Sequence, residues 1–432
     1  MSAQQLVGAL GRNAAVVLVA VLVLGLGLTV VTVVGGDGEG GPGADTGATT
    51  ATGVVEDETG KRLAGATITM GSERTTSNSR GEFSLDATEP ATATAKLKGH
   101  LSRTLVLEPG RPRTIALTGQ QQETLSLRFG GDVMAGRRFY EQVDGEDPLL
   151  SSTPSAREHA RLLTGVKPLL EDADLSMVNL ETPLIEKPYF DPSEERPKRF
   201  HETKEIAFAS HTSMARGLKD SGVDVVSLAN NHVMDAHEQG LDTTVKALDR
   251  AGVEHFGAGV DADDAWKPTY VKKRGQTVGY VGCTTVDGAR HPQSYVATKN
   301  KPGAAQCNAA QLRKSVTEAK RRADVVVFSP HGDVEYRRQQ VSEIRDLMNV
   351  ARQAGAAVIA GHHPHVVGGV TGGDDYVMAE STGNLLFDQT LWETFPSYRD
   401  EGLTRSIGVS NFTAADMPVS FHITLKNAED SD

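Results

Sequence analysis

Three histidines lie within four positions in the segment Gly361-His-His-Pro-His365. Imidazoles at this spacing, around a turn stiffened by Pro364, can point at one cation, and neutral imidazole is a common metal ligand. A surface cluster of histidines without partners is the alternative. His363 and His365 are therefore candidate ligands of a metal-dependent protein.

Polar residues follow four further apolar runs of the kind that form buried strands. These runs end in Gly130-Gly-Asp132, Asn179-Leu-Glu181, Asn230-Asn-His232 and Ser329-Pro-His331. Open α/β sheets build their sites from loops at the carboxyl ends of strands, so the polar residues can meet in one crevice. Mixed oxygen and nitrogen ligands favour Mn, Fe or Zn over Ca or a thiolate-bound metal. We expect one or two divalent ions, held by Asp132, Glu181, Asn231, His331, His363 and His365.

The elements that must position these residues lie between residues 124 and 425, where strand-like runs alternate with helical patterns. This alternation predicts an α/β domain. Residues 238–251 illustrate a helix, because Leu241, Val245 and Leu248 share one face and Gly252 follows as a stop signal.

The N-terminal part of the chain predicts a membrane anchor, a tether and a small β domain. Residues 14–34 carry no charge and are long enough to cross a bilayer as a helix. Arg12 before this run places residues 1–13 in the cytoplasm and the main domains outside, as a single-pass protein of the cell membrane. A cleaved signal peptide is the alternative. Residues 35–52 are rich in Gly, Ala, Thr and Asp and predict a flexible linker, and residues 53–119 predict a β-sandwich.

Composition narrows the classes of function and of site. The chain has 432 residues and a formal charge of -12, which argues against a nucleic-acid partner. Two cysteines, Cys283 and Cys307, are too few for a thiolate zinc site. In an oxidising compartment they can close a loop of about 25 residues, a disulfide for which a buried, unpaired Cys283 is the alternative.

Several motifs occur in order along residues 124–410: Gly131-Asp-Val-Met-Ala-Gly-Arg137, Asn179-Leu-Glu181, Ser227-Leu-Ala-Asn-Asn-His232, Gly257-Ala-Gly259, Gly361-His-His-Pro-His365 and Gly383-Asn384 with Phe387-Asp-Gln389. Together they resemble the CapA (PgsA-like) family of capsule and poly-γ-glutamate synthesis proteins. The resemblance implies a calcineurin-like metallophosphatase sandwich of two mixed sheets flanked by helices. The segment beginning Gly53-Val-Val-Glu-Asp-Glu-Thr-Gly60 resembles a carboxypeptidase regulatory-like domain.

The resemblance also implies roles for single residues. Asp132 matches the first-strand ligand, Glu181 stands where a metal-bridging aspartate is usual, and His232 matches the histidine that donates a proton. Asn231, His331, His363 and His365 match the remaining ligands. Arg137, Asn230 and Asn384 are candidate substrate-binding residues, although Arg137 is equally consistent with a plain surface charge.

Met134 departs from the family pattern, because it occupies the position of a metal-binding histidine. We therefore expect one tightly bound ion and a weak or absent second one. His237 has no role in the family pattern and is expected on the surface at a helix start.

Two functions follow from the sequence. One is a membrane-tethered metallohydrolase that acts on a phosphoester or an envelope polymer intermediate, which the retained His232 favours. The other is a non-catalytic assembly component that holds an anionic polymer beside polymer-synthase subunits, which Met134 favours. A metallophosphoesterase unrelated to capsule is a further alternative.

Overall fold

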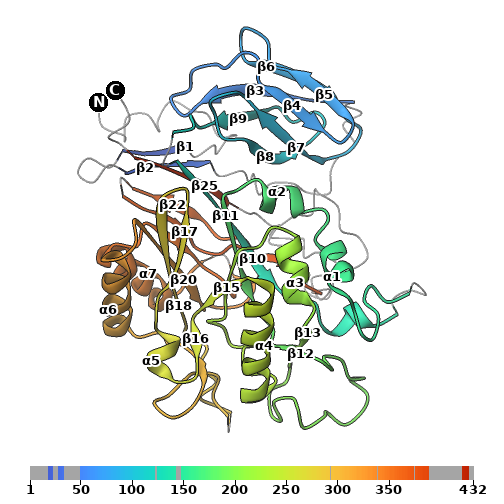
Figure 1. Ribbon diagram of the computed structural model, residues 1–432, viewed down its shortest axis with the longest axis vertical. Coiled ribbons are helices and arrows are strands. Elements are labelled where there is room, and N and C mark those ends of the chain that lie inside the picture. Colours follow the sequence, from blue (N-terminus) through green and yellow to red (C-terminus); the bar gives the residue numbers. More distant parts are fainter. Residues whose placement is uncertain are drawn as a thin grey trace.

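The computed structural model describes residues 49–121, 124–142, 147–291, 293–337, 339–373 and 375–388, together with the backbone of three strands outside these ranges. Those strands are β1 (Leu18–Leu22), β2 (Leu28–Val33) and β25 (Phe421–Asn427). Figure 1 shows a small all-β domain at one end of a larger α/β domain.

The small domain consists of two facing sheets. One sheet has the order β6-β3-β9 and the other the order β5-β4-β7-β8. In β6, Phe83 and Leu85 alternate with exposed residues, as expected for a sheet with one buried face. Both sheets pack around one apolar core. The strands are β3 (Thr50–Asp57), β4 (Thr67–Met70), β5 (Glu73–Thr76), β6 (Glu82–Asp86), β7 (Ala91–Lys96), β8 (Arg103–Leu107) and β9 (Arg113–Leu117).

The large domain is a mixed α/β sandwich. Its first sheet has the order β1-β2-β25-β10-β11-β14-β15, with β24 also paired to β10, and its second has the order β17-β18-β20-β21-β23-β22. The first sheet contains β10 (Leu125–Val133), β11 (Leu175–Leu180), β14 (Val225–Ser227), β15 (Glu254–Phe256) and β24 (Asn384–Leu386). The second contains β17 (Thr269–Lys273), β18 (Gln276–Thr284), β20 (Val325–His331), β21 (Val358–Ala360), β22 (Val370–Gly372) and β23 (Val377–Ala379).

Apolar residues on both faces of the strands hold the layers together. Phe129 and Val225 of the first sheet share a core with Val327 and Val358 of the second, so the sheets pack face to face. Val326, the neighbour of Val327, points instead into a core formed with the helices on the outer face. A strand buried on both faces requires an unbroken apolar run, which explains the sequence of β20.

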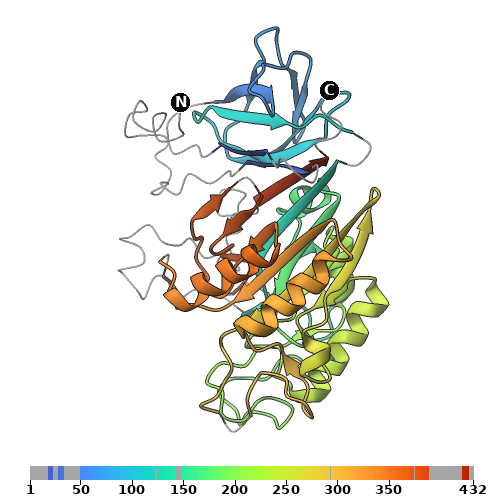
Figure 2. The same ribbon diagram turned by 90° about the vertical axis from the view of Figure 1, so that its left-hand side faces the viewer.

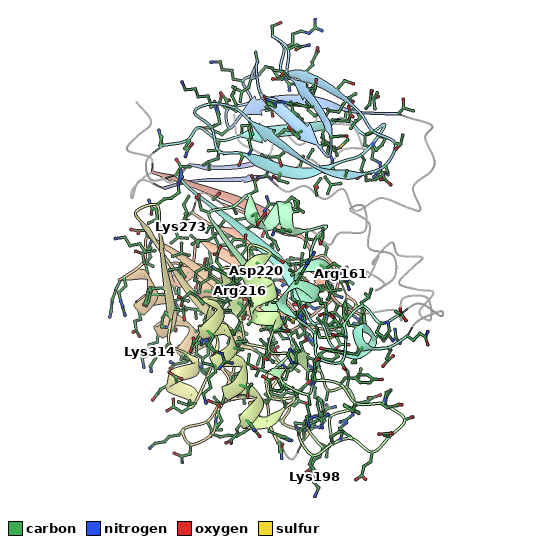
Figure 3. All side chains as sticks on the ribbon, turned by 45° about the vertical axis from the view of Figure 1, so that its right-hand side comes forward. Arg161, Lys198, Arg216, Asp220, Lys273 and Lys314 are labelled. Carbon is green, nitrogen blue, oxygen red and sulfur yellow. A yellow bond between two sulfur atoms is a disulfide. The ribbon has the colours of Figure 1, made fainter. Side chains whose placement is uncertain are left out.

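Helices cover the outer face of each sheet. The helices α3 (Met214–Asp220) and α4 (His237–Ala251) pack on the first sheet, and α6 (Ala309–Lys320) and α7 (Ser342–Ala354) pack on the second. Figure 2 shows α6 and α7 lying in front of the strands. The outward faces of these helices are polar. On α3, for example, Arg216 and Asp220 lie one turn apart and form an exposed ion pair of 2.8 Å, and both are labelled in Figure 3. As predicted, α4 ends at Gly252, which adopts a left-handed conformation with φ of 69°.

Shorter elements complete the α/β domain. The helices are α1 (Ala156–Leu162), α2 (Lys167–Glu171) and α5 (Ala262–Ala265). Two small sheets pair β12 (Leu184–Ile185) with β13 (Ser210–His211) and β16 (Ala258–Gly259) with β19 (Gly303–Ala304). Cys283, at the end of β18, forms a disulfide with Cys307, so the predicted bridge is confirmed.

A buried carboxylate connects the two domains. Asp172, which follows α2, accepts hydrogen bonds of 2.6 Å from the Ser102 hydroxyl and from the Thr104 backbone N–H of the small domain. Arg128 of β10 lies 3.7 Å from the same carboxylate. The small domain is therefore attached through specific polar contacts next to the first sheet.

Where the structure describes residues of the predicted transmembrane helix, they form strands and not a helix. Within residues 14–34, the two described stretches are the strands β1 and β2, which pair with one another, and β2 also pairs with β25. The rest of that run, and residues 35–48 of the predicted linker, lie outside the described residues. The run is rich in Val, which favours extended backbone outside a bilayer. Among the described residues there is no helix with the length and apolar character of a membrane span.

Candidate metal centre

The polar residues that follow the strands meet at the place where the carboxyl ends of strands from the two sheets come together. The register places Asp132 of β10 beside Asn179 of β11 and beside Asn384 of β24. On the second sheet, His331 of β20 pairs with His362. The structure brings together all six predicted ligands, and each is at most 7% exposed: Asp132, Glu181, Asn231, His331, His363 and His365.

Asp132 is the most heavily contacted carboxylate of this centre. It accepts a hydrogen bond of 2.8 Å from the Asn179 amide, and its oxygens lie 3.2 Å from His362 Nδ1 and 3.4 Å from His365 Nδ1. Burial opposes its ionisation, but the hydrogen bond from His362 and the charges of the neighbouring imidazoles hold the pKa of Asp132 below its usual range. The preceding Gly131 is required, because a Cβ there would lie 2.0 Å from the Gly383 carbonyl oxygen.

Glu181 is fully buried and has no hydrogen-bond partner on either carboxylate oxygen among the described residues. Its Oε1 lies 3.5 Å from His331 Nε2 and 3.8 Å from His232 Nε2. Burial raises the pKa of Glu181 well above its usual range, and the negative charge of Asp132 raises it further. A buried carboxylate without partners is unfavourable unless a cation compensates it. This arrangement therefore fits a divalent ion.

Glu181 belongs to two triads of donor atoms, in each of which the atoms lie within 4.8 Å of one another. One triad is Glu181, His331 and His363, and the other is Asp132, Glu181 and His365. Such spacing suits one ion per triad, because metal–ligand bonds of about 2.0–2.2 Å keep the ligand atoms about 3–4 Å apart. The residues present thus fit two cations that share Glu181.

The histidines of these triads are poorly solvated. Burial lowers the pKa of His363 to about 3 and, together with the positive charge of His363, holds that of His331 well below its usual range. Both imidazoles are therefore neutral at pH 7, the form that binds a metal. His363 Nδ1 has no hydrogen-bond partner among the described residues, whereas His331 Nε2 contacts Asn231 Oδ1 at 2.7 Å.

His232 lies beside Glu181 and is oriented by two buried residues, Asp235 and Lys204. Its Nδ1 contacts Asp235 Oδ2 at 2.6 Å, while Lys204 Nζ donates to Asp235 Oδ1 at 2.7 Å. The Phe208 ring stacks on the imidazole at 3.9 Å between centroids. Burial and the Lys204 charge lower the pKa of His232 to about 4. Lys204 Nζ also lies 2.9 Å from His232 Nδ1, so this nitrogen is held between Asp235 and Lys204, and Nε2 lies towards Glu181.

Of the three predicted substrate-binding residues, Asn230 and Asn384 form hydrogen bonds with residues of the centre and its loops, whereas Arg137 contacts Asp388 and Phe208 beside it. Asn230 donates to Asn179 Oδ1 at 3.1 Å and accepts from the His232 backbone N–H at 3.1 Å, so its side chain holds the loop that carries His232. Asn384 Oδ1 contacts His365 Nδ1 at 2.8 Å.

Arg137 begins a short 3₁₀ helix, Arg137–Tyr140, and is ion-paired rather than a plain surface charge. It pairs with the buried carboxylate of Asp388, and its guanidinium lies 4.6 Å from the centre of the Phe208 ring. Of the motif that contains Asp388, Gln389 lies outside the described residues.

Met134 is fully buried next to the centre. Its sulfur accepts from the Gly136 backbone N–H at 2.9 Å, and its side chain packs with Phe208 and Phe387. The position at which the resemblance implies a histidine therefore carries an apolar contact.

A cavity of about 350 Å³ lies next to the loop that follows His232. Its lining includes Met234, His201 and His237, and His237 has a positive φ of 57° at the start of α4. The expected surface residue at this helix start thus lines a cavity. His201 is 1% exposed, and its Nε2 contacts the Gln293 carbonyl oxygen at 2.8 Å.

Sequence reasoning did not assign five residues of the centre and its surroundings. His362 and Asn179 lie inside motifs that the sequence shows, so their residue types and their positions after predicted strands could have indicated a place in the centre. Lys204 and Asp235 had no such signal, because Lys204 comes from a loop before α3 and meets Asp235 only in the folded chain. The fifth, Glu335, forms a third group of donor atoms with His363 and His365.

Comparison with known proteins places the centre in a sequence family. Residues 126–389 match the family described as bacterial capsule synthesis protein PGA_cap. The PGA biosynthesis protein CapA of Bacillus subtilis (strain 168) is 28% identical over 314 residues, which cover 72% of this chain and 76% of that protein. The capsule biosynthesis protein CapA of Bacillus anthracis is 29% identical over 276 residues, covering 62% and 61%. Among solved structures, the calcineurin-like phosphoesterase YfkN of Bacillus subtilis is similar with a TM-score of 0.36 and 16% identity, covering 57% of this chain and 73% of that chain.

Proposed function

The chain belongs to the bacterial capsule synthesis protein family PGA_cap, and from this premise we propose that it is a metal-dependent hydrolase of capsule or poly-γ-glutamate synthesis, acting on a phosphoester or an envelope polymer intermediate. The names of its relatives support a role in capsule or poly-γ-glutamate synthesis, and the residues of the metal centre support metal-dependent hydrolysis. The observation that carries the proposal is Glu181, a buried carboxylate without hydrogen-bond partners among the described residues that belongs to both donor triads.

Asp132, Glu181, His331, His363 and His365 would hold the ions, with Asn231 as a further oxygen donor. Mn, Fe or Zn fit this mixture of carboxylate, amide and imidazole donors. When bound, such ions polarise a phosphoryl oxygen and lower the pKa of a coordinated water. If two divalent ions are bound, Asp132 and Glu181 would neutralise two of their four positive charges, and the remaining positive charge would attract an anionic substrate.

His232 is the residue placed to move a proton. Its Nε2 faces the centre, and Asp235 holds the opposite nitrogen, so the imidazole cannot rotate without breaking a buried hydrogen bond. An anionic substrate beside Nε2 raises the pKa of His232, because a nearby negative charge favours the imidazolium. His232 can then protonate the leaving oxygen.

Arg137 supports recognition of an anionic group. Its side chain is 34% exposed, and the guanidinium is held against Phe208 next to His232. A guanidinium in this position can bind carboxylate or phosphate if it exchanges contacts with Asp388.

The alternative is a non-catalytic component that uses the same centre to hold an anionic polymer beside polymer-synthase subunits. Met134 favours it, because an apolar side chain packs where one more ligand is expected. Metal analysis of the purified chain, with a screen of phosphomonoester and phosphodiester hydrolysis, separates the two functions. Turnover that is lost in His232→Ala supports the hydrolase. Bound metal without turnover under any metal supplement supports the holding role, and absence of bound metal refutes both.

We also propose that the α/β domain lies outside the cytoplasmic membrane. The disulfide between Cys283 and Cys307 supports this location, because disulfides persist in oxidising compartments. Residues 14–34 would deliver the chain, as an uncleaved anchor or as a signal peptide, and in that role they would not form the strands β1 and β2. The β-sandwich, which we regard as a carboxypeptidase regulatory-like spacer, would separate the membrane from the α/β domain. Protease added to intact spheroplasts should cleave the α/β domain, and protection of that domain would refute this location.

A further inference from the structure

The loop 332–337, which follows β20, is bound to the loop that carries the histidine motif. The Gly332 backbone N–H donates to the His362 carbonyl oxygen at 3.1 Å, and the Tyr336 N–H donates to the Pro364 carbonyl oxygen at 2.8 Å. The Tyr336 and His365 rings lie 5.9 Å apart. The two loops therefore keep a defined position relative to one another.

Both loops contain residues in a backbone conformation that side chains with a Cβ rarely adopt. In the described part of the chain seven non-glycine residues have positive φ, and four of them lie here: Asp333 (99°), Tyr336 (62°), His363 (97°) and His365 (58°). Such conformations persist where the surrounding structure requires them, and they are concentrated at functional sites. Glu335 lies between two of these residues, Asp333 and Tyr336, so its backbone position is set by this part of the loop.

The Glu335 carboxylate and one nitrogen each of His363 and His365 lie within 4.8 Å of one another. His363 also belongs to the triad with His331, and His365 to the triad with Asp132. Both histidines are buried, whereas Glu335 is exposed, so this carboxylate lies on the solvent side of the centre. The His363 Nδ1 atom, buried and without a hydrogen-bond partner among the described residues, leaves room for a further contact.

We propose that Glu335 is an additional metal ligand, which closes the centre on its solvent side and contacts an ion held by His363 or His365. A carboxylate at the entrance of a site for anionic substrates would repel them if no cation were bound beside it. As a ligand, Glu335 instead neutralises part of the charge of the ions. Because its side chain is exposed, it can leave the ion when an anionic group of the substrate arrives.

Titration of the metal-free full-length chain with Mn²⁺ and with Zn²⁺ by isothermal calorimetry tests this inference. Glu335→Gln removes the charge and keeps the size of the side chain. It should weaken the binding of at least one ion about 10-fold or more, or remove one equivalent. Asp346→Asn, which neutralises an exposed carboxylate on α7, is the matched control and should bind like the wild type.

The inference rests on the metal centre of the proposed function, and the outcomes separate the two. If the wild type binds metal and Glu335→Gln binds with the same affinity and stoichiometry, Glu335 is not a ligand and the proposed function stands. If the wild type binds neither ion, the metal centre and this inference are both wrong. Thermal unfolding without metal should be unchanged in Glu335→Gln. If that variant fails to fold, Glu335→Ala replaces it, and unchanged metal binding in that variant overturns the inference.

Discussion

Replacement of Glu181 by Gln should have opposite effects on stability with and without metal. In the metal-free protein, burial and the charge of Asp132 raise the pKa of Glu181 above its ordinary value of 4.5. A folded-state pKa above the unfolded value means that stability is complete below pH 4.5 and is lost as the pH rises towards the folded-state pKa. Glutamine does not ionise and escapes this loss.

The width of the pH window limits the size of the effect. Between the ordinary pKa of 4.5 and pH 7 the loss of stability cannot exceed about 3 kcal/mol, because each pH unit contributes at most about 1.4 kcal/mol. We expect metal-free Glu181→Gln to exceed the wild type by about 1–3 kcal/mol at pH 7 and by much less at pH 5. At about 2–4 °C for each kcal/mol, the melting temperature should rise by several degrees.

Metal should reverse this order. An ion at 100 times its dissociation constant stabilises the wild type by about 2.7 kcal/mol. Glu181→Gln should gain far less, because the lost carboxylate belongs to both triads. The assay is urea unfolding followed by circular dichroism, in EDTA and in excess Mn²⁺, at pH 5 and pH 7.

Glu194→Gln, which neutralises an exposed carboxylate in the loop before α3, is the matched control and should resemble the wild type in every condition. The reasoning is refuted if metal-free Glu181→Gln is less stable than the wild type at pH 7, or if it gains as much stability from Mn²⁺.

Three further predictions concern other parts of the α/β domain. His363→Ala should lower the metal content and the metal-dependent stability together, whereas His232→Ala should keep its metal. Elemental analysis and thermal unfolding measure these two quantities. Loss of metal in both variants would show that His232 is itself a ligand. Replacing Cys283 and Cys307 by Ser should cost about 3.5 kcal/mol by the chain-entropy estimate, and two alkylatable thiols in the unreduced wild type would contradict the bridge. Burial lowers the pKa of His159 to about 4 from 6.5, so its contribution to the free energy of unfolding is complete above pH 6.5 and falls by about 3 kcal/mol as the pH drops towards 4. Urea unfolding should show a smaller loss of stability over this pH range in His159→Gln than in the wild type. An equal loss in both proteins would refute this prediction.

The types and order of the residues are enough to predict the chemistry available at the centre. Each predicted ligand follows a run of apolar residues, and the carboxyl ends of neighbouring strands meet, so the chain alone predicts that Asp132, Glu181 and His331 lie together. The same local logic predicted the end of α4 at Gly252, because a glycine accepts the left-handed conformation that terminates a helix.

The partner of each buried polar group follows instead from the folded arrangement of the two sheets. Asn230 bonds inward to Asn179, Lys204 reaches Asp235 from a distant loop, and Glu335 comes close to the two histidines, and none of these contacts has a periodic signature in the chain. The strands β1 and β2 appear where an apolar run predicted a helix, because Val-rich segments take the conformation that their neighbours and surroundings offer. Hydrophobic patterns specify which faces are buried, whereas the pairing of buried polar groups depends on distances that exist only after the two sheets have packed.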